Sequence, residues 1–154
     1  MTQAVVQRRE LAMTGRTVFL SRLIGLFALI LSLALLADKE ASVSAIVALV
    51  HERPLLLIIG MMGLLAGLAI VLTHNVWSGG VVPTLITLIG WWILIRGVLL
   101  ILLPAGEAVR LFDILRYEEL FYLYTGVTLI IGIFLTYRGF TTSVPFYAQE
   151  RATR

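Results

Sequence analysis

Four long apolar runs, separated by shorter polar stretches, dominate the hydrophobic pattern of the chain. They cover residues 17–37, 55–73, 81–103 and 120–137. A helix rises about 1.5 Å per residue, so about 20 apolar residues suffice to cross the hydrocarbon core of a bilayer. The pattern therefore predicts an all-α membrane protein. We expect a four-transmembrane-helix bundle in which residues 1–154 form a single integral membrane domain.

The two connections on one side of the predicted membrane carry a pattern of their own. In residues 42–51 and 107–117, apolar side chains recur every three or four positions with polar ones between them. This spacing is typical of short amphipathic helices that lie on a membrane surface, and we expect one helix in each connection. A lid over a cavity is the alternative interpretation of these segments.

The sequence also indicates an internal repeat with an offset of about 65 residues. Each copy of the repeat consists of a span, a surface helix and a second span. The match rests on small residues, which align as Gly25 with Gly90, Ser32 with Gly97 and Gly60 with Gly126. An even number of spans separates the copies, so the pattern predicts two parallel hairpin repeats related by an axis along the membrane normal.

Small residues also predict where helices pack closely. Gly63 and Gly67 are four positions apart in the second run, and without Cβ atoms two helix backbones can approach there. Packing inside the bundle is the interpretation we favour, and dimerisation is the alternative. The predicted packing positions are Gly25, Ser32, Gly60, Gly63, Gly67, Gly90, Gly97 and Gly126.

Composition and charge narrow the class of protein further. The chain is 60% hydrophobic and only 14% charged, and the absence of cysteine excludes disulfides and cysteine-ligated metal. Its net charge of +3 comes from basic residues beside the apolar runs, which indicates membrane topology rather than nucleic-acid binding. The terminal flanks hold seven basic residues against four in the outer connections, which predicts that both termini are cytoplasmic.

Arg96 is the strongest candidate for a functional residue, because it is a charge placed well inside an apolar run. It could snorkel to the outer interface and meet Glu118 or Glu119. It could instead anchor an anion, or pair with an acid on a partner subunit. Trp92 lies four positions earlier, on the same helical face, so Arg96 and Trp92, with Trp91 beside them, predict a site for an amphiphile.

A weaker candidate lies where the second run ends. His74 and Asn75 could relay protons or polar interactions there, although an interfacial histidine needs no function. No spacing of histidines and carboxylates indicates a metal site, and we expect no metal and no cofactor. No nucleophile lies in a pattern with a general base, so we expect no catalytic residues and no enzyme activity.

The segment from Thr73-His-Asn-Val-Trp77 through Leu88-Ile-Gly-Trp-Trp-Ile-Leu-Ile-Arg-Gly97 to Pro104 resembles small, uncharacterised bacterial inner-membrane proteins with four helices. The resemblance covers the second and third runs. It implies a bacterial inner-membrane location, adds weight to Arg96, His74 and Asn75, and transfers no activity.

Two hypotheses about function follow from these patterns. The first is a non-enzymatic accessory or structural subunit that acts through helix–helix contacts, as a homo-oligomer or with a partner membrane subunit. The second is a small transporter or binder of an amphiphilic anion or lipid that uses Arg96 and Trp92. Both hypotheses make membrane lipids the surroundings of the protein, and neither involves nucleic acid.

Overall fold

The computed structural model describes residues 15–77 and 79–142. This part of the chain forms six α-helices: α2 (Gly15–Ala37), α3 (Lys39–His51), α4 (Arg53–Thr73), α5 (Val81–Leu102), α6 (Ala105–Ile114) and α7 (Phe121–Thr141). Helices α2, α4, α5 and α7 are long and apolar enough to cross a membrane. The prediction of an all-α protein with four candidate spans is confirmed, with ends that shift by a few residues.

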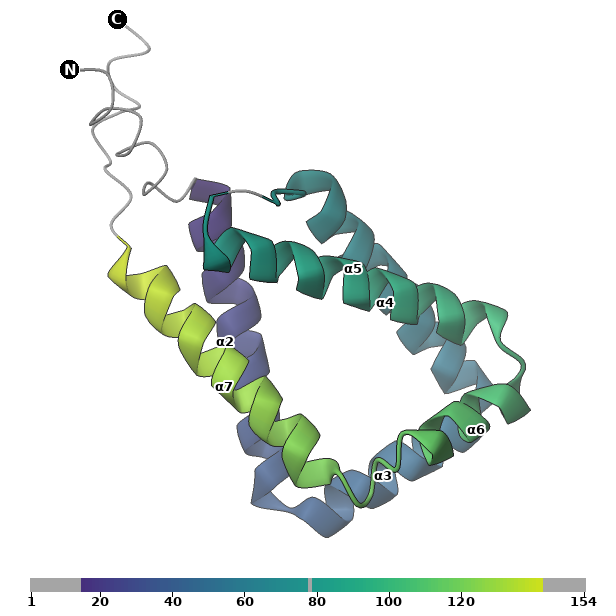
Figure 1. Cartoon of the computed structure of the whole chain (residues 1–154). Helices are drawn as coiled ribbons and strands as arrows, with labels where there is room; N and C mark the ends of the chain where they lie inside the picture. Colours follow the sequence, from purple (N-terminus) through teal and green to yellow (C-terminus); the bar gives the residue numbers. More distant parts are fainter. Residues whose placement is uncertain (1–14, 78, 143–154) are drawn as a thin grey trace, which may run out of the picture.

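The four long helices pack as two antiparallel pairs, α4 with α5 and α2 with α7 (Figure 1). The pairs touch where α2 meets α5, and they diverge toward the end bridged by α3 and α6. The two spans of each predicted hairpin, α2 with α4 and α5 with α7, therefore do not pack along each other. This corrects the hairpin part of the prediction. The reason is length: α3 has 13 residues and covers about 20 Å, which carries α4 away from α2.

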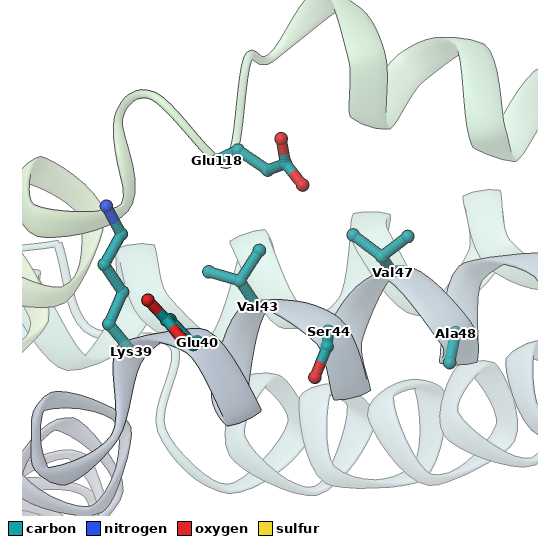
Figure 2. Close-up of a pocket in the computed structure, with 7 residues that line it drawn as sticks. All are labelled: Lys39, Glu40, Val43, Ser44, Val47, Ala48 and Glu118. Carbon is teal, nitrogen blue, oxygen red and sulfur yellow. The ribbon is translucent and has the colours of Figure 1, made fainter.

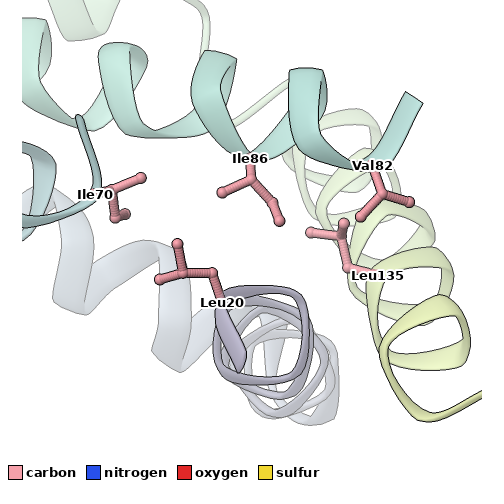
Figure 3. Close-up of a cluster of buried hydrophobic side chains, with 5 residues drawn as sticks. All are labelled: Leu20, Ile70, Val82, Ile86 and Leu135. Carbon is pink, nitrogen blue, oxygen red and sulfur yellow. The ribbon is translucent and has the colours of Figure 1, made fainter. Parts of the chain in front are cut away.

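Apolar side chains from all four long helices meet where the pairs touch (Figure 3). The cluster consists of Leu20 from α2, Ile70 from α4, Val82 and Ile86 from α5, and Leu135 from α7. Lipid tails are as apolar as these side chains, so close packing contributes more here than removal from water. This junction joins the two pairs at one end of the molecule.

The short helices α3 and α6 differ in length from the predicted surface helices. The Asp38 carboxylate accepts a hydrogen bond from the Ala41 backbone nitrogen at 2.9 Å, and this N-cap begins α3 at Lys39 rather than at residue 42. Arg116 has a φ of 47°, in the left-handed region, and α6 ends before it at Ile114. The location of both helices on a membrane surface stays a prediction.

Arg53 joins the start of α4 to the end of α5. Its guanidinium donates to the backbone carbonyl of Leu103 and, at 3.2 Å, to that of Ile101. The last carbonyls of a helix have no partner within the helix and carry partial negative charge, so a guanidinium stabilises them. Arg53 thus closes the α4–α5 pair at the end opposite to its connecting turn.

Candidate functional site

The face of α5 that carries the predicted amphiphile site is open. Arg96 is exposed, Trp92 is 69% exposed and Trp91 is 37% exposed. The opposite side of α5 is occupied by the seam with α4, which passes through Gly90 and Gly97. Trp92 and Arg96 therefore share an open helical face rather than the wall of an enclosed pocket.

Arg96 nevertheless lies on the side of α5 that faces the other helix pair. Ile89 and Ile93 pack against the junction cluster, and Arg96 follows them by seven and three positions, which returns to the same helical face. Burial raises the pKa of Tyr117, and the positive charge of Arg96 opposes that rise. Arg96 is therefore close enough to Tyr117, in the α6–α7 turn, for its charge to act there.

The acids predicted as partners of Arg96 lie elsewhere. Glu119 forms an ion pair with Arg116 at 2.7 Å, and both side chains are exposed. No ion pair joins Arg96 to an acid among the side chains that the structure describes. Tyr117, the group on which the charge of Arg96 acts, stacks on Tyr124 with ring centres 5.7 Å apart. Sequence reasoning did not single out Tyr117 for a role at this site.

His74 is buried at the end of α4. Its backbone nitrogen donates to the Ile70 carbonyl at 2.7 Å, and the residue is only 3% exposed. Its Nε2 atom has no hydrogen-bond partner among the described residues. Burial lowers the pKa of His74, and a hydrogen bond to the Pro83 backbone carbonyl opposes this effect. The net shift favours the neutral form of the imidazole.

The α4–α5 turn is organised by Thr87 rather than by a His74–Asn75 pair. The buried Thr87 hydroxyl accepts from the Val76 backbone nitrogen at 3.1 Å and lies within 3.3 Å of the His74 carbonyl. Asn75 is exposed, and its Oδ1 accepts from the Trp77 indole nitrogen at 2.8 Å. The two residues of the predicted relay point to different partners.

The glycines of α4 and α5 form a seam along which the two backbones approach. A Cβ on Gly67 would stand 2.5 Å from the Leu94 backbone nitrogen, and one on Gly60 would stand 3.2 Å from the Gly97 carbonyl oxygen. A Cβ on Gly63 would stand 3.5 Å from the Gly97 Cα. A Cβ at Gly67 would push the helices apart, whereas one at Gly63 would make ordinary van der Waals contact.

A second seam joins α2 to α7. A Cβ on Gly25 would stand 2.6 Å from the Thr136 backbone nitrogen, whereas Ser32 is buried and donates to the Leu29 carbonyl of its own helix at 3.0 Å. Gly126 is not in this seam, because nothing lies within 4 Å of its Cβ position. The seam uses Gly132 and Gly139 instead, which sequence reasoning missed.

Comparison with known proteins gives no family for this chain. It matches no family model, no curated protein and no solved structure. The interpretation of the site therefore rests on its own geometry. Within residues 15–77 and 79–142, no group of three or more histidines and acids is placed to hold a metal ion.

Proposed function

We propose that this protein is a non-enzymatic integral membrane subunit that acts through helix–helix contacts. The divergence of the two helix pairs carries this proposal. Each pair is closed by its own seam, and within the described residues the long helices of the two pairs meet mainly at the junction at one end. Only 22–28% of the most apolar stretch of each span is buried. The apolar faces beyond the junction are available to a helix from a second copy or from a partner subunit.

The protein in this proposal is a duplicated unit. An offset of 65 residues relates Gly132 to Gly67 and Leu29 to Leu94. A Cβ on Gly132 would stand 2.8 Å from the Leu29 backbone nitrogen, and a Cβ on Gly67 would stand 2.5 Å from the Leu94 backbone nitrogen, so the same close contact occurs in both pairs. The same offset relates the buried residues Ile70 and Leu135. Contacts that repeat in this way support two copies related by an axis along the membrane normal.

The proposed location is a bacterial inner membrane with both termini in the cytoplasm. The excess of basic residues in the terminal flanks supports this orientation. It would put the His74 turn and the junction at the cytoplasmic face. Helices α3 and α6 would then lie at the outer face.

Photo-crosslinking tests the subunit proposal. A photoreactive amino acid is placed singly, in cells, at exposed positions on two faces of α5: Leu88, Trp92, Ile95 and Leu99 on one face, and Trp91, Val98 and Leu102 on the other. A protein partner that packs on α5 gives crosslinked protein bands with a period of three to four residues. Crosslinks to lipid alone at every position would overturn the proposal. The mass of the bands separates a second copy from a different subunit.

A second candidate function is binding of an amphiphilic anion at Arg96 and Trp92. The observation in its favour is that Arg96, inside a span and facing the other pair, has no ion pair among the described side chains. A buried acid would normally accompany such a charge. In mixed lipid, Arg96→Gln should lower the retention of an anionic phospholipid, while Arg138→Gln should not. Equal retention in both variants would exclude this function.

A further inference from the structure

A groove of about 590 Å³ lies between α3 and the turn that connects α6 to α7 (Figure 2). Helix α3 supplies its floor, and the side chain of Glu118 hangs over it from the turn. The lining residues are Lys39, Glu40, Val43, Ser44, Val47, Ala48 and Glu118. None of these residues belongs to the Arg96–Trp92 face or to the proposed helix–helix surface on α5.

One part of the groove is charged. Lys39, Glu40 and Glu118 together carry a formal charge of −1, so the groove as a whole repels a simple anion. The Lys39 ammonium lies 4.8 Å from the centre of the Tyr122 ring, which fixes its position by a cation–π contact. Neither Glu40 nor Glu118 forms an ion pair among the side chains described, so both carboxylates remain available to a cation.

The rest of the groove floor is mostly apolar, and the Ser44 hydroxyl on it donates to the Ala41 carbonyl of the same helix at 2.9 Å. Val43 and Val47 are four positions apart on α3, which places both on the face that looks toward Glu118 (Figure 2). Helix α3 begins directly after α2 ends at Ala37 and stops just before α4 begins at Arg53. In the membrane arrangement proposed above, a groove at the shared end of two candidate spans lies at the depth where lipid head groups meet acyl chains.

We propose that this groove binds a phospholipid whose head group carries a primary ammonium, as in phosphatidylethanolamine. The lipid ammonium donates to the carboxylates of Glu118 and Glu40, and the lipid phosphate lies against Lys39. The upper part of an acyl chain covers Val43 and Val47. A primary ammonium has three N–H donors, whereas a quaternary ammonium has none, so the carboxylates favour the former.

Competition between lipids tests the site. The protein is purified in mixed micelles with equal amounts of phosphatidylethanolamine, phosphatidylcholine and phosphatidylglycerol, and retained lipids are counted by native mass spectrometry. We expect phosphatidylethanolamine to be enriched about threefold, the scale of one partly exposed charge pair. Glu118→Gln should abolish this enrichment. Glu107→Gln is the matched control, because Glu107 is an exposed acid on α6 paired with Arg110 at 3.2 Å.

Several results would overturn the proposal. These are equal retention of the three lipids by the native protein, enrichment that survives Glu118→Gln, and a loss of enrichment that is as large in Glu107→Gln. Lys39→Gln is a second, independent test of the site. It should weaken phosphatidylethanolamine retention without removing the carboxylates. Arg96→Gln should leave phosphatidylethanolamine retention unchanged, which separates this groove from an anion site on α5.

Discussion

At the scale of single residues, the structure separates glycines that join helices from a glycine that does not. A Cβ on Gly97 would collide with the Leu64 backbone nitrogen, whereas nothing lies within 4 Å of the Cβ position of Gly126. Both glycines are inside helices, so alanine improves intrinsic helix propensity equally at the two positions, by about 1 kcal/mol. The difference between the two variants therefore measures the packing of the α4–α5 seam.

We predict that Gly97→Ala destabilises the protein by about 1–3 kcal/mol relative to Gly126→Ala, because overpacking forces the two backbones apart. Thermal unfolding in detergent, followed by circular dichroism, measures the difference. Equal melting temperatures for the two variants would contradict the close approach of α4 and α5 at Gly97.

His74 makes a second prediction at this scale, which concerns pH. The pKa of His74 in the folded protein is lowered below its ordinary value of 6.5 by burial. As the pH falls below about 6.5, the unfolded chain binds a proton there more readily than the folded protein does, so stability decreases on acidification. Well above that pH the imidazole is neutral in both states and has no effect.

Melting temperatures between about pH 8 and about pH 5.5 test this sign. The native protein should lose stability on acidification, and His74→Gln should lose less. His51→Gln is the control, because His51 is exposed on α3 and its variant should keep the native slope. If the melting temperature changed with pH equally in His74→Gln and in the native protein, the lowered pKa of a buried His74 would be contradicted.

Arg96 shows why the candidate site could be predicted only in part. A charge inside an apolar run is visible in the sequence, and so is its spacing from Trp92. The effect of the Arg96 charge on Tyr117 depends on the turn after α6, where Arg116 adopts a left-handed conformation. Such a conformation is uncommon for a residue other than glycine, so it could not be predicted from the sequence.

At the scale of elements, Arg53 links two helix ends that are far apart in the sequence. Its guanidinium donates to the Leu103 and Ile101 carbonyls of the α5 end. We predict that Arg53→Gln destabilises the protein by about 1.5–3 kcal/mol, the usual contribution of hydrogen bonds that involve a charged group. Detergent unfolding measures this loss.

Arg110→Gln is the control for Arg53. Arg110 has a side chain that is 75% exposed and pairs with Glu107 of its own helix, so its replacement should change stability little. A loss in Arg110→Gln that equals the loss in Arg53→Gln would show a general effect of charge instead of the helix-end contact.

The helices themselves could be predicted because their length and apolar character are local properties of the chain. Their pairing could not, because a glycine indicates a close approach without indicating the partner. The prediction aligned Gly60 with Gly126, but the buried residue at the equivalent point of α7 is Thr125. One residue corresponds to about 100° of helix rotation, so this small shift moves a side chain out of the seam.

At the scale of the whole molecule, each half of the chain depends on the other. The first half holds α2, α3 and α4, and the second holds α5, α6 and α7, while both long pairs combine one helix from each half. The halves are joined by the exposed α4–α5 turn, where Gly79 and Gly80 have φ values of 109° and 114°. A break in this turn removes no contact of either seam.

We predict that the two halves, cut at this turn and produced together as separate chains, associate in the membrane and copurify. The reason is that two glycine seams and the junction cluster all cross between the halves. Copurification through a tag on one half measures the association. Gly97→Ile in the second half should weaken it, and Gly126→Ile, outside both seams, should not. Halves that fail to associate would contradict the pairing of α2 with α7 and of α4 with α5, because hairpins that pack within each half need no partner.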